Sequence, residues 1–209
     1  MSRPAHLFFV LAGLVLLTAS IVFGPDWQVK RLPTGRELLQ PVRIEGVAPE
    51  FSLNDVQGRE VSLSGMKKQF VLLNFWATWC EPCIGEIPHL ARLASRVGDL
   101  PLTLVLVSVD EETARVTSVA DVFEDEARKR AENAIPELKY AAELIRGRPA
   151  NVESILDPTE KTAHLFGTSK YPETYLIAPG GRLVAKFIGP KEWGRPRVIE
   201  FIRRMISVK

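Results

Sequence analysis

The sequence predicts an α/β domain: a mixed sheet with helices on both faces, an N-terminal hairpin and a central helical insertion. Two stretches, FVLLNFW at 70–76 and LTLVLVSV at 102–109, are apolar throughout, which is typical of central strands covered on both sides. Two further strand patterns flank Gly180-Gly181, and amphipathic helical patterns follow the first buried strand and end the chain. This order of strands and helices indicates one sheet with mixed strand directions.

Length and composition fit one such domain with a terminal appendage. The chain has 209 residues, of which 46% are hydrophobic and 25% are charged, and domains commonly contain about 100 to 200 residues. The 27 basic and 25 acidic residues give a net charge of +2, and neither sign forms a long run. No nucleic-acid partner is therefore expected.

The first 47 residues are expected to lie outside the domain. Residues 7–23 read LFFVLAGLVLLTASIVF, 17 residues without a charge, which is the lower end of the length of a membrane-spanning helix. We therefore assign residues 1–24 to a membrane anchor or, as an alternative, to a signal peptide cleaved near Thr18-Ala19-Ser20. Residues 25–47 contain several prolines and no apolar periodicity, and they are predicted to be a linker.

Two patterns give opposite predictions for the side of the membrane. A short basic start before an apolar stretch is typical of an export signal, so the domain is expected on the extracytoplasmic (periplasmic) side of the cell inner membrane, or free in the periplasm after cleavage. Positive charge usually marks the cytoplasmic flank, and more of it follows the apolar stretch than precedes it, at Lys30, Arg31, Arg36 and Arg43. We favour export.

The domain is predicted to run from residue 48 to residue 209. It begins with two short strands around NDVQGRE, where Gly58 supplies the turn. The strand at 70–76 is followed by apolar residues at helical spacing from Ile84 to Val97. ETYLIAP and RLVAKFI are expected to pair as an antiparallel hairpin, and the last helix has an apolar face between Val198 and Ile206.

The central helical insertion covers about residues 113–152. Acidic residues at 124–126 precede basic residues at 128–130 by four positions, a spacing that stabilises an exposed helix by about 0.2–0.5 kcal/mol per pair. Pro136 is expected to start a second helix that Gly147 ends. We interpret the insertion as a solvated pair of helices or as a surface that selects a partner. In either case a short link in its place is expected to lower stability only modestly.

Cys80 and Cys83, the only cysteines, stand where the buried strand at 70–76 gives way to a helix. A disulfide between such close residues constrains the unfolded chain little, so a structural role explains the pair poorly. Unpaired backbone N–H groups at a helix start favour a thiolate, which we assign to Cys80. The two-residue gap lets Cys83 attack a mixed disulfide formed on Cys80, and this exchange needs no cofactor.

Several stretches accompany the pair: APEFSL at 48–53, NFWATWCEPC at 74–83, Glu86, LDPTEKTAHLFG at 156–167 and YPETYLI at 171–177. Together they resemble the thioredoxin superfamily and its membrane-anchored TlpA/ResA branch, over the chain from about Ala48 to its end. The resemblance implies a thioredoxin-like fold, a redox disulfide between Cys80 and Cys83, and reduction of protein disulfides outside the cytoplasm. It implies as partners a protein substrate such as an apocytochrome c during cytochrome c biogenesis, and a membrane electron donor of the thiol-transfer type.

The resemblance also assigns roles to single residues. Cys80 becomes the attacking thiol and Cys83 the resolving thiol. Pro172 matches a cis proline that faces the pair, so the Tyr171-Pro172 bond is predicted to be cis. Thioredoxins proper carry a buried aspartate where this chain has Asn74, and Glu86 is the expected proton acceptor in its place; its alternative is an ordinary exposed helix residue. The residues expected to contact the substrate are Trp79, Glu81, Pro82, Tyr171 and Pro172.

The alternative function is that of a thioredoxin-fold metal-binding or copper-delivery protein. Zinc normally takes four nitrogen or sulfur ligands, and besides the cysteines the domain offers only His89 and His164, which form no paired motif. We therefore expect no metal and no organic cofactor. Glu81 and Glu86 near the thiols favour a reductant over a strong oxidant. Trp193 is interpreted as structural.

Overall fold

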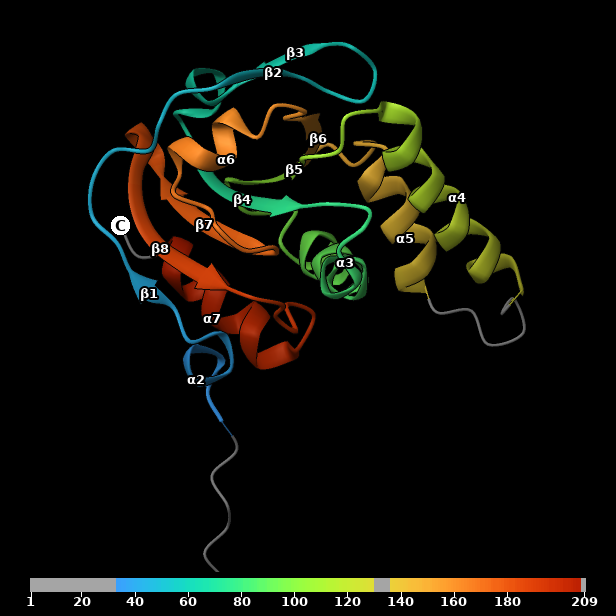
Figure 1. Ribbon diagram of the computed structural model, residues 1–209. Helices are drawn as coiled ribbons and strands as arrows, with labels where there is room; N and C mark the ends of the chain where they lie inside the picture. Colours follow the sequence, from blue (N-terminus) through green and yellow to red (C-terminus); the bar gives the residue numbers. More distant parts are fainter. Residues whose placement is uncertain (1–32, 130–135, 208–209) are drawn as a thin grey trace, which may run out of the picture. The chain divides into compact units, whose positions relative to one another are not determined.

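Figure 1 shows a computed structural model of the chain, which describes residues 33–129 and 136–207. Residues from Thr34 onward form one compact unit. The anchor or signal peptide predicted at residues 1–24 and the first part of the predicted linker lie outside the described residues. Within residues 33–129 and 136–207, no helix is long and apolar enough to cross a membrane.

The domain is built on a six-stranded sheet in the order β1-β8-β7-β4-β5-β6. Strands β4, β5 and β6 are parallel, whereas β7 is antiparallel to β4, β8 to β7 and β1 to β8. This mixed sheet confirms the predicted fold class. The strands are β1 (Val42–Arg43), β4 (Phe70–Trp76), β5 (Leu102–Ser108), β6 (Val152–Leu156), β7 (Glu173–Ala178) and β8 (Arg182–Ile188).

Helices cover both faces of this sheet, as predicted. Figure 1 shows α3 and α7 on one face and α6 on the other. The helices are α2 (Gly35–Leu39), α3 (Glu81–Arg96), α4 (Thr113–Lys129), α5 (Pro136–Ile145), α6 (Lys161–Leu165) and α7 (Pro196–Ser207), with 3₁₀ turns η1 (Leu63–Met66) and η3 (Pro179–Gly181).

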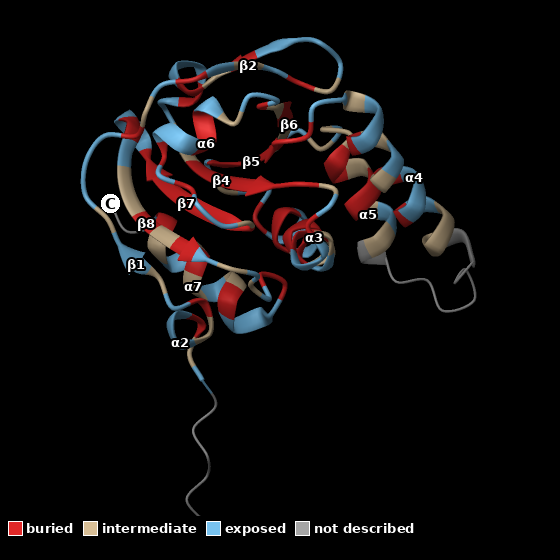
Figure 2. Ribbon diagram, in the orientation of Figure 1, coloured by how far each residue is buried: buried red, intermediate tan, exposed pale blue. Residues whose placement is uncertain are grey.

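Burial explains the two apolar stretches of the sequence. All residues of β5 and all residues of β4 after Phe70 are buried, and Figure 2 shows these parts of both strands in red. A strand with protein on both faces needs no polar alternation. The continuous runs at 70–76 and 102–109 are therefore central strands, as predicted.

The predicted N-terminal hairpin is also present. Strands β2 (Ser52–Asn54) and β3 (Glu60–Ser62) pair antiparallel as a separate two-stranded sheet. Gly58 in the turn has a φ of +84°, a conformation that glycine adopts without strain. The hairpin lies beside β6, where the Val56 N–H donates to the Ser154 carbonyl at 3.0 Å.

The linker prediction is wrong in its second half, because residues 34–43 belong to the domain. Thr34 caps α2 through a reciprocal pair of hydrogen bonds with Glu37. Leu39 at the end of this helix is fully buried. α2 packs on α7 so closely that a Cβ on Gly35 would lie 2.2 Å from the Arg197 carbonyl oxygen. β1 then extends the sheet next to β8.

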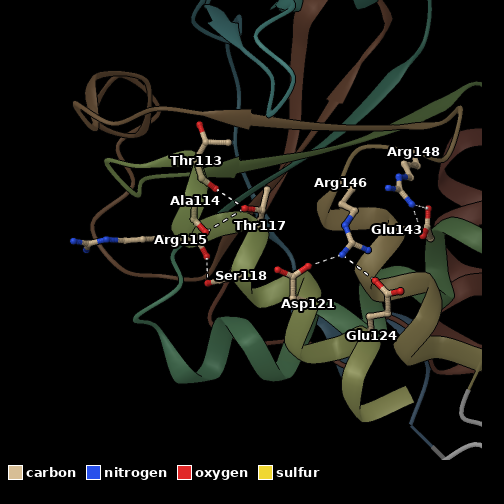
Figure 3. A network of polar contacts seen from close by, with 10 residues as sticks. All are labelled: Thr113, Ala114, Arg115, Thr117, Ser118, Asp121, Glu124, Glu143, Arg146 and Arg148. Atoms are coloured by element: carbon tan, nitrogen blue, oxygen red, sulfur yellow. Dashed lines mark hydrogen bonds and ion pairs between the residues drawn. The ribbon is translucent and has the colours of Figure 1, made fainter. Parts of the chain in front are cut away.

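The central insertion forms two helices, α4 and α5, and Gly147 with its φ of +61° follows the second. Figure 3 shows how Arg146 joins them: its guanidinium lies 2.7 Å from Asp121 Oδ1 and 3.0 Å from Glu124 Oε2 of α4. α5 packs against α3 and contributes four fully buried residues, Ala141, Ala142, Leu144 and Ile145. α5 is therefore part of the core, and the structure argues against the expectation that a short link could replace residues 113–152 at modest cost.

Candidate active site

The cysteines occupy the turn between β4 and α3, where the sequence predicts them. Cys80 is the N-cap of α3 and Cys83 lies in its first turn. The two sulfurs form a disulfide of 2.04 Å. Cys80 is 7% exposed and Cys83 is 1% exposed, so an incoming group reaches Cys80 first.

A backbone N–H group at the start of α3 points at the sulfur of Cys80. The Cys83 N–H donates to Cys80 Sγ at 3.3 Å, and the positive end of the α3 dipole points in the same direction. Donors at a helix start stabilise an anion. After reduction, this geometry favours a thiolate on Cys80 and supports its predicted role as the attacking thiol.

An exposed aromatic surface lies next to the pair. Trp79 is 65% exposed, and its ring packs edge-on against the ring of Tyr171 with centroids 5.8 Å apart. The Tyr171-Pro172 peptide bond is cis, as predicted. Glu81 and Pro82 are exposed on α3. Three of the residues predicted to contact the substrate, Trp79, Glu81 and Pro82, are therefore exposed beside the cysteines, and Trp79 contacts Tyr171 of the proline loop. Their role in substrate binding stays a prediction.

The proline loop is held by the segment that precedes α6. The Tyr171 hydroxyl donates to Glu160 Oε2 at 2.7 Å, and burial together with this hydrogen bond raises the pKa of Tyr171. Glu160 itself has a φ of +54°, which is uncommon for a residue with a side chain. On the other side, Asn74 Nδ2 of β4 donates to Thr174 Oγ1 of β7 at 2.9 Å, so a side-chain bond links the two strands that carry the pair and the proline.

Glu86 is buried, and its alternative reading as an exposed helix residue is wrong. It is 2% exposed on α3. Its Oε1 accepts from the Lys191 N–H at 2.8 Å and from Trp193 Nε1 at 2.6 Å, and its Oε2 accepts from Asn74 Nδ2 at 3.2 Å. The carboxyl group thus lies one helical turn beyond Cys83, held by three donors from two segments, β4 and the chain between β8 and α7.

Burial raises the pKa of Glu86 from 4.5 to about 7, against the lowering effect of the hydrogen bonds from Lys191, Trp193 and Asn74. A group with a pKa near the working pH can both take and release a proton efficiently. The structure therefore places a group suited to proton transfer beside the resolving cysteine, which supports the role predicted for Glu86.

Two contributors to the site were missed in the sequence. Trp193, interpreted as structural, is fully buried and donates to Glu86, and no local pattern links it to a residue more than a hundred positions earlier. Asp110 hydrogen-bonds to Thr78 in the turn that leads to Cys80. Its position directly after a buried parallel strand could have indicated that it lies near the cysteines, because parallel strands end at the same edge of the sheet.

The histidines show no sign of a shared site. His164 is exposed on α6 and His89 is half-buried on α3. Across the part of the chain that the structure describes, no group of three or more histidine, cysteine or acidic residues is placed to hold a metal ion.

Comparison with known proteins agrees with this geometry. The chain is 28% identical over 142 residues to the thiol-disulfide oxidoreductase ResA of Bacillus subtilis, a match that covers 68% of this chain and 65% of that protein. It is 24% identical over 150 residues to ResA of Bacillus thuringiensis, covering 72% of each. A solved structure from Chlorobium tepidum, described as a thiol:disulfide interchange protein DsbE, matches with a TM-score of 0.53 and 25% identity over 79% of this chain and 96% of that one. These neighbours share the thioredoxin-like fold, and residues 44–186 match the AhpC/TSA family. The chain therefore belongs to the AhpC/TSA family.

Proposed function

We propose that this chain is a thiol–disulfide oxidoreductase that reduces disulfides in proteins outside the cytoplasm, where residues 7–23 hold it at the membrane. The observation that carries the proposal is the Cys80–Cys83 disulfide at the start of α3, with Cys80 as the more exposed sulfur. The similarity to proteins named thiol-disulfide oxidoreductase ResA supports the same chemistry.

The first step uses the reduced protein. The Cys80 thiolate attacks one sulfur of a substrate disulfide, the substrate S–S bond breaks, and one substrate thiolate leaves and takes up a proton. The product is a mixed disulfide between Cys80 and the substrate. Trp79, which directly precedes Cys80, packs against Tyr171 of the proline loop, and the two rings supply an apolar surface for the substrate chain.

The second step releases the substrate. Cys83 gives its proton to the Glu86 carboxylate and attacks the Cys80 sulfur, which breaks the mixed disulfide and frees the second substrate thiol. The protein now holds the Cys80–Cys83 disulfide, and the substrate has gained two electrons and two protons. An external dithiol must restore the pair, and a membrane electron donor of the thiol-transfer type fits this need.

The charges near the pair favour electron flow from this protein to its substrate. A strong oxidant of this class stabilises its reduced thiolate. In this chain the exposed Glu81 and the buried Glu86 both lie within the first two turns of the same helix, and negative charge there opposes the thiolate. Both carboxylates therefore favour a reductant.

The test is reduction of insulin by a fragment of residues 34–209 supplied with a dithiol. The fragment begins at Thr34 because α2 and β1 belong to the domain. We expect turnover by the wild-type fragment and none by Cys80→Ser. Wild-type turnover by Cys80→Ser would contradict the mechanism. One tightly held zinc or copper ion per chain in metal analysis would favour the alternative, metal-binding function.

The substrate is identified by trapping. Cys83→Ser cannot resolve the mixed disulfide, so it should accumulate a partner joined to Cys80 that a reductant releases, and Cys80→Ser should trap none. We propose an apocytochrome c as the partner class. A set of trapped proteins without any cytochrome would refute that part of the proposal and leave the chemistry intact.

The location is tested separately. A phosphatase fused after Lys209 is active only outside the cytoplasm, and a fluorescent protein fused there only inside. Phosphatase activity is the expected result. Fluorescence alone would reverse the proposed side of the membrane and agree with the positive charges after the apolar stretch.

A further inference from the structure

Asp110 lies at the same edge of the sheet as the redox pair. Strands β4 and β5 are parallel, with Trp76 opposite Ser108 at their ends, and the Val109 N–H donates to the Trp76 carbonyl at 3.1 Å. The chain that leaves β4 leads to Cys80, and the chain that leaves β5 leads to Asp110. Register alone therefore brings these two segments together.

The carboxylate of Asp110 holds the turn before Cys80. Its Oδ1 accepts from Thr78 Oγ1 at 2.6 Å, and its Oδ2 accepts from the Thr78 N–H at 2.9 Å and from Ser108 Oγ at 2.6 Å. Asp110 is 3% exposed. A backbone N–H can only donate, so the Asp110 side chain is the acceptor in its hydrogen bond with the Thr78 N–H. Thr78 precedes Trp79 by one position and Cys80 by two.

The described residues that hydrogen-bond to this carboxylate are Thr78 and Ser108, and neither is a cation. Buried charges are screened less by salt than exposed ones. A fixed negative charge near a thiol disfavours the thiolate, as any like charge does. The N–H donors at the start of α3 act in the opposite direction on Cys80.

We propose that Asp110 is a positioning residue of the redox site. By binding Thr78 it fixes the turn that carries Trp79 and Cys80, and its negative charge destabilises the Cys80 thiolate, which makes the reduced pair a stronger reductant. This inference rests on the proposed function, because it needs a pair that cycles between dithiol and disulfide. Oxidation of the pair to the disulfide releases two electrons, and the thiols give up two protons with them.

Other charged or titratable groups lie on the segments that form the site, and their contributions must stay constant in a test. They are Glu81 and Glu86 on α3, Glu111 after β5, Tyr171 with Glu160 at the proline loop, and Lys191 beside Glu86. A single substitution at position 110 leaves all of them in place. The difference between variant and wild type therefore reports Asp110 alone.

The experiment compares Asp110→Asn with Glu111→Gln in the full-length protein. Asparagine keeps the size and one acceptor for Thr78 but removes the buried charge, whereas Glu111→Gln removes the same charge from an exposed neighbour. Thiolate absorbance of the reduced protein titrates in two steps, one for each thiol, and the lower midpoint gives the acidity of Cys80. Equilibration with glutathione gives the redox equilibrium constant.

For Asp110→Asn we expect the thiolate midpoint to fall by about one pH unit. Above the wild-type midpoint the redox equilibrium should move about tenfold towards the reduced pair, which is about 30 mV for a two-electron couple. At a pH where Cys80 is protonated in both proteins, the difference should vanish. Glu111→Gln should show a much smaller change. Equal midpoints in Asp110→Asn and wild type would overturn the proposal.

Thr78→Val separates the charge from the geometry. This variant loses the hydroxyl bond to Asp110 and keeps the buried charge, so its thiolate midpoint should stay at the wild-type value while turnover of a protein disulfide falls. A midpoint that moves as in Asp110→Asn would show that the charge is not the cause. If Asp110→Asn does not fold, Asp110→Ser gives the same comparison.

The outcome is distinct from failure of the proposed function. A wild-type protein whose pair does not exchange with glutathione would refute the function itself. A pair that exchanges normally but is insensitive to position 110 would refute only the role of Asp110.

Discussion

Replacing Glu86 by glutamine removes a buried charge whose effect on stability can be worked out from the structure. The pKa of Glu86 rises from 4.5 to about 7 on burial. A carboxyl group with a higher pKa in the folded state stabilises that state fully below its unfolded pKa, and the contribution is lost as the pH rises through the folded pKa. The pKa difference of about 2.5 corresponds to about 3 kcal/mol. Between about pH 4 and pH 8, the unfolding free energy of the wild type should therefore fall by about 3 kcal/mol relative to Glu86→Gln.

Glutamine fits the site, so the variant should fold. Its carbonyl oxygen can accept from the Lys191 N–H and Trp193 Nε1 as Glu86 Oε1 does. Its amide group then faces Asn74, whose Oδ1 has no partner in the structure and becomes an acceptor when the Asn74 amide turns over. The turn exchanges the unpaired Oδ1 of Asn74 for its Nδ2, so the number of unpaired side-chain groups at Asn74 stays the same while the titration is removed.

The assay is urea unfolding of the oxidised protein across this pH range. Glu81→Gln is the matched control, because Glu81 lies on the same helix but is exposed, and its stability should follow the wild-type curve. In exchange kinetics, Glu86→Gln should slow the step in which Cys83 resolves the mixed disulfide, by about 10²–10⁴-fold if general-base catalysis has its usual size. Parallel stability curves for wild type and Glu86→Gln, or an unchanged rate from about pH 6 to pH 9, would refute the reasoning.

Three further predictions address other parts of the structure. Trp193→Phe removes a donor to the Glu86 carboxylate, so the pKa of Glu86 should rise further above 7, which a carboxyl ¹³C titration of labelled protein measures; a lower pKa would contradict the assigned hydrogen bond. Leu39→Ala should lower the free energy of unfolding by about 2–5 kcal/mol, because Leu39 is fully buried. An unchanged unfolding curve would show that α2 adds nothing to the stability of the domain, as expected of a linker. Trp79→Ala should leave stability nearly unchanged because the side chain is exposed, while kcat/KM for a protein disulfide falls roughly fivefold through loss of about 1 kcal/mol of aromatic contact; equal activity with insulin would exclude Trp79 from substrate binding.

Patterns that repeat along the chain allowed prediction of most of the fold. The apolar runs of β4 and β5, the turn at Gly180-Gly181 and the amphipathic last helix were found because each spans enough residues to show a period or a turn. α2 and β1 were missed for the opposite reason. A five-residue helix and a two-residue strand show no period. Their partners in the fold are α7 and β8, which lie far along the chain.

The site divides in the same way. The cysteines and the cis proline lie in local motifs, so their places could be predicted. The burial of Glu86 could not, because it depends on Lys191 and Trp193, which the fold brings to α3 from beyond β8. The contribution of α5 to the core could not be predicted in the same way, because α5 packs against α3, from which β5 and α4 separate it along the chain.

Both edges of the six-stranded sheet offer little free backbone to an incoming strand, which matters for a protein that we propose acts on other proteins. Exposed strand edges pair with other chains and promote aggregation. Here β1, with two residues, ends one side, and the β2–β3 hairpin bridges to β6 on the other, through Asp55 opposite Ile155. Among the described residues, few backbone groups at the edges of the sheet therefore remain for an extended substrate to pair with as an added strand. Under the proposed function, such a substrate binds at Trp79 and Tyr171 beside Cys80. It leaves once its disulfide is reduced, without pairing with the sheet.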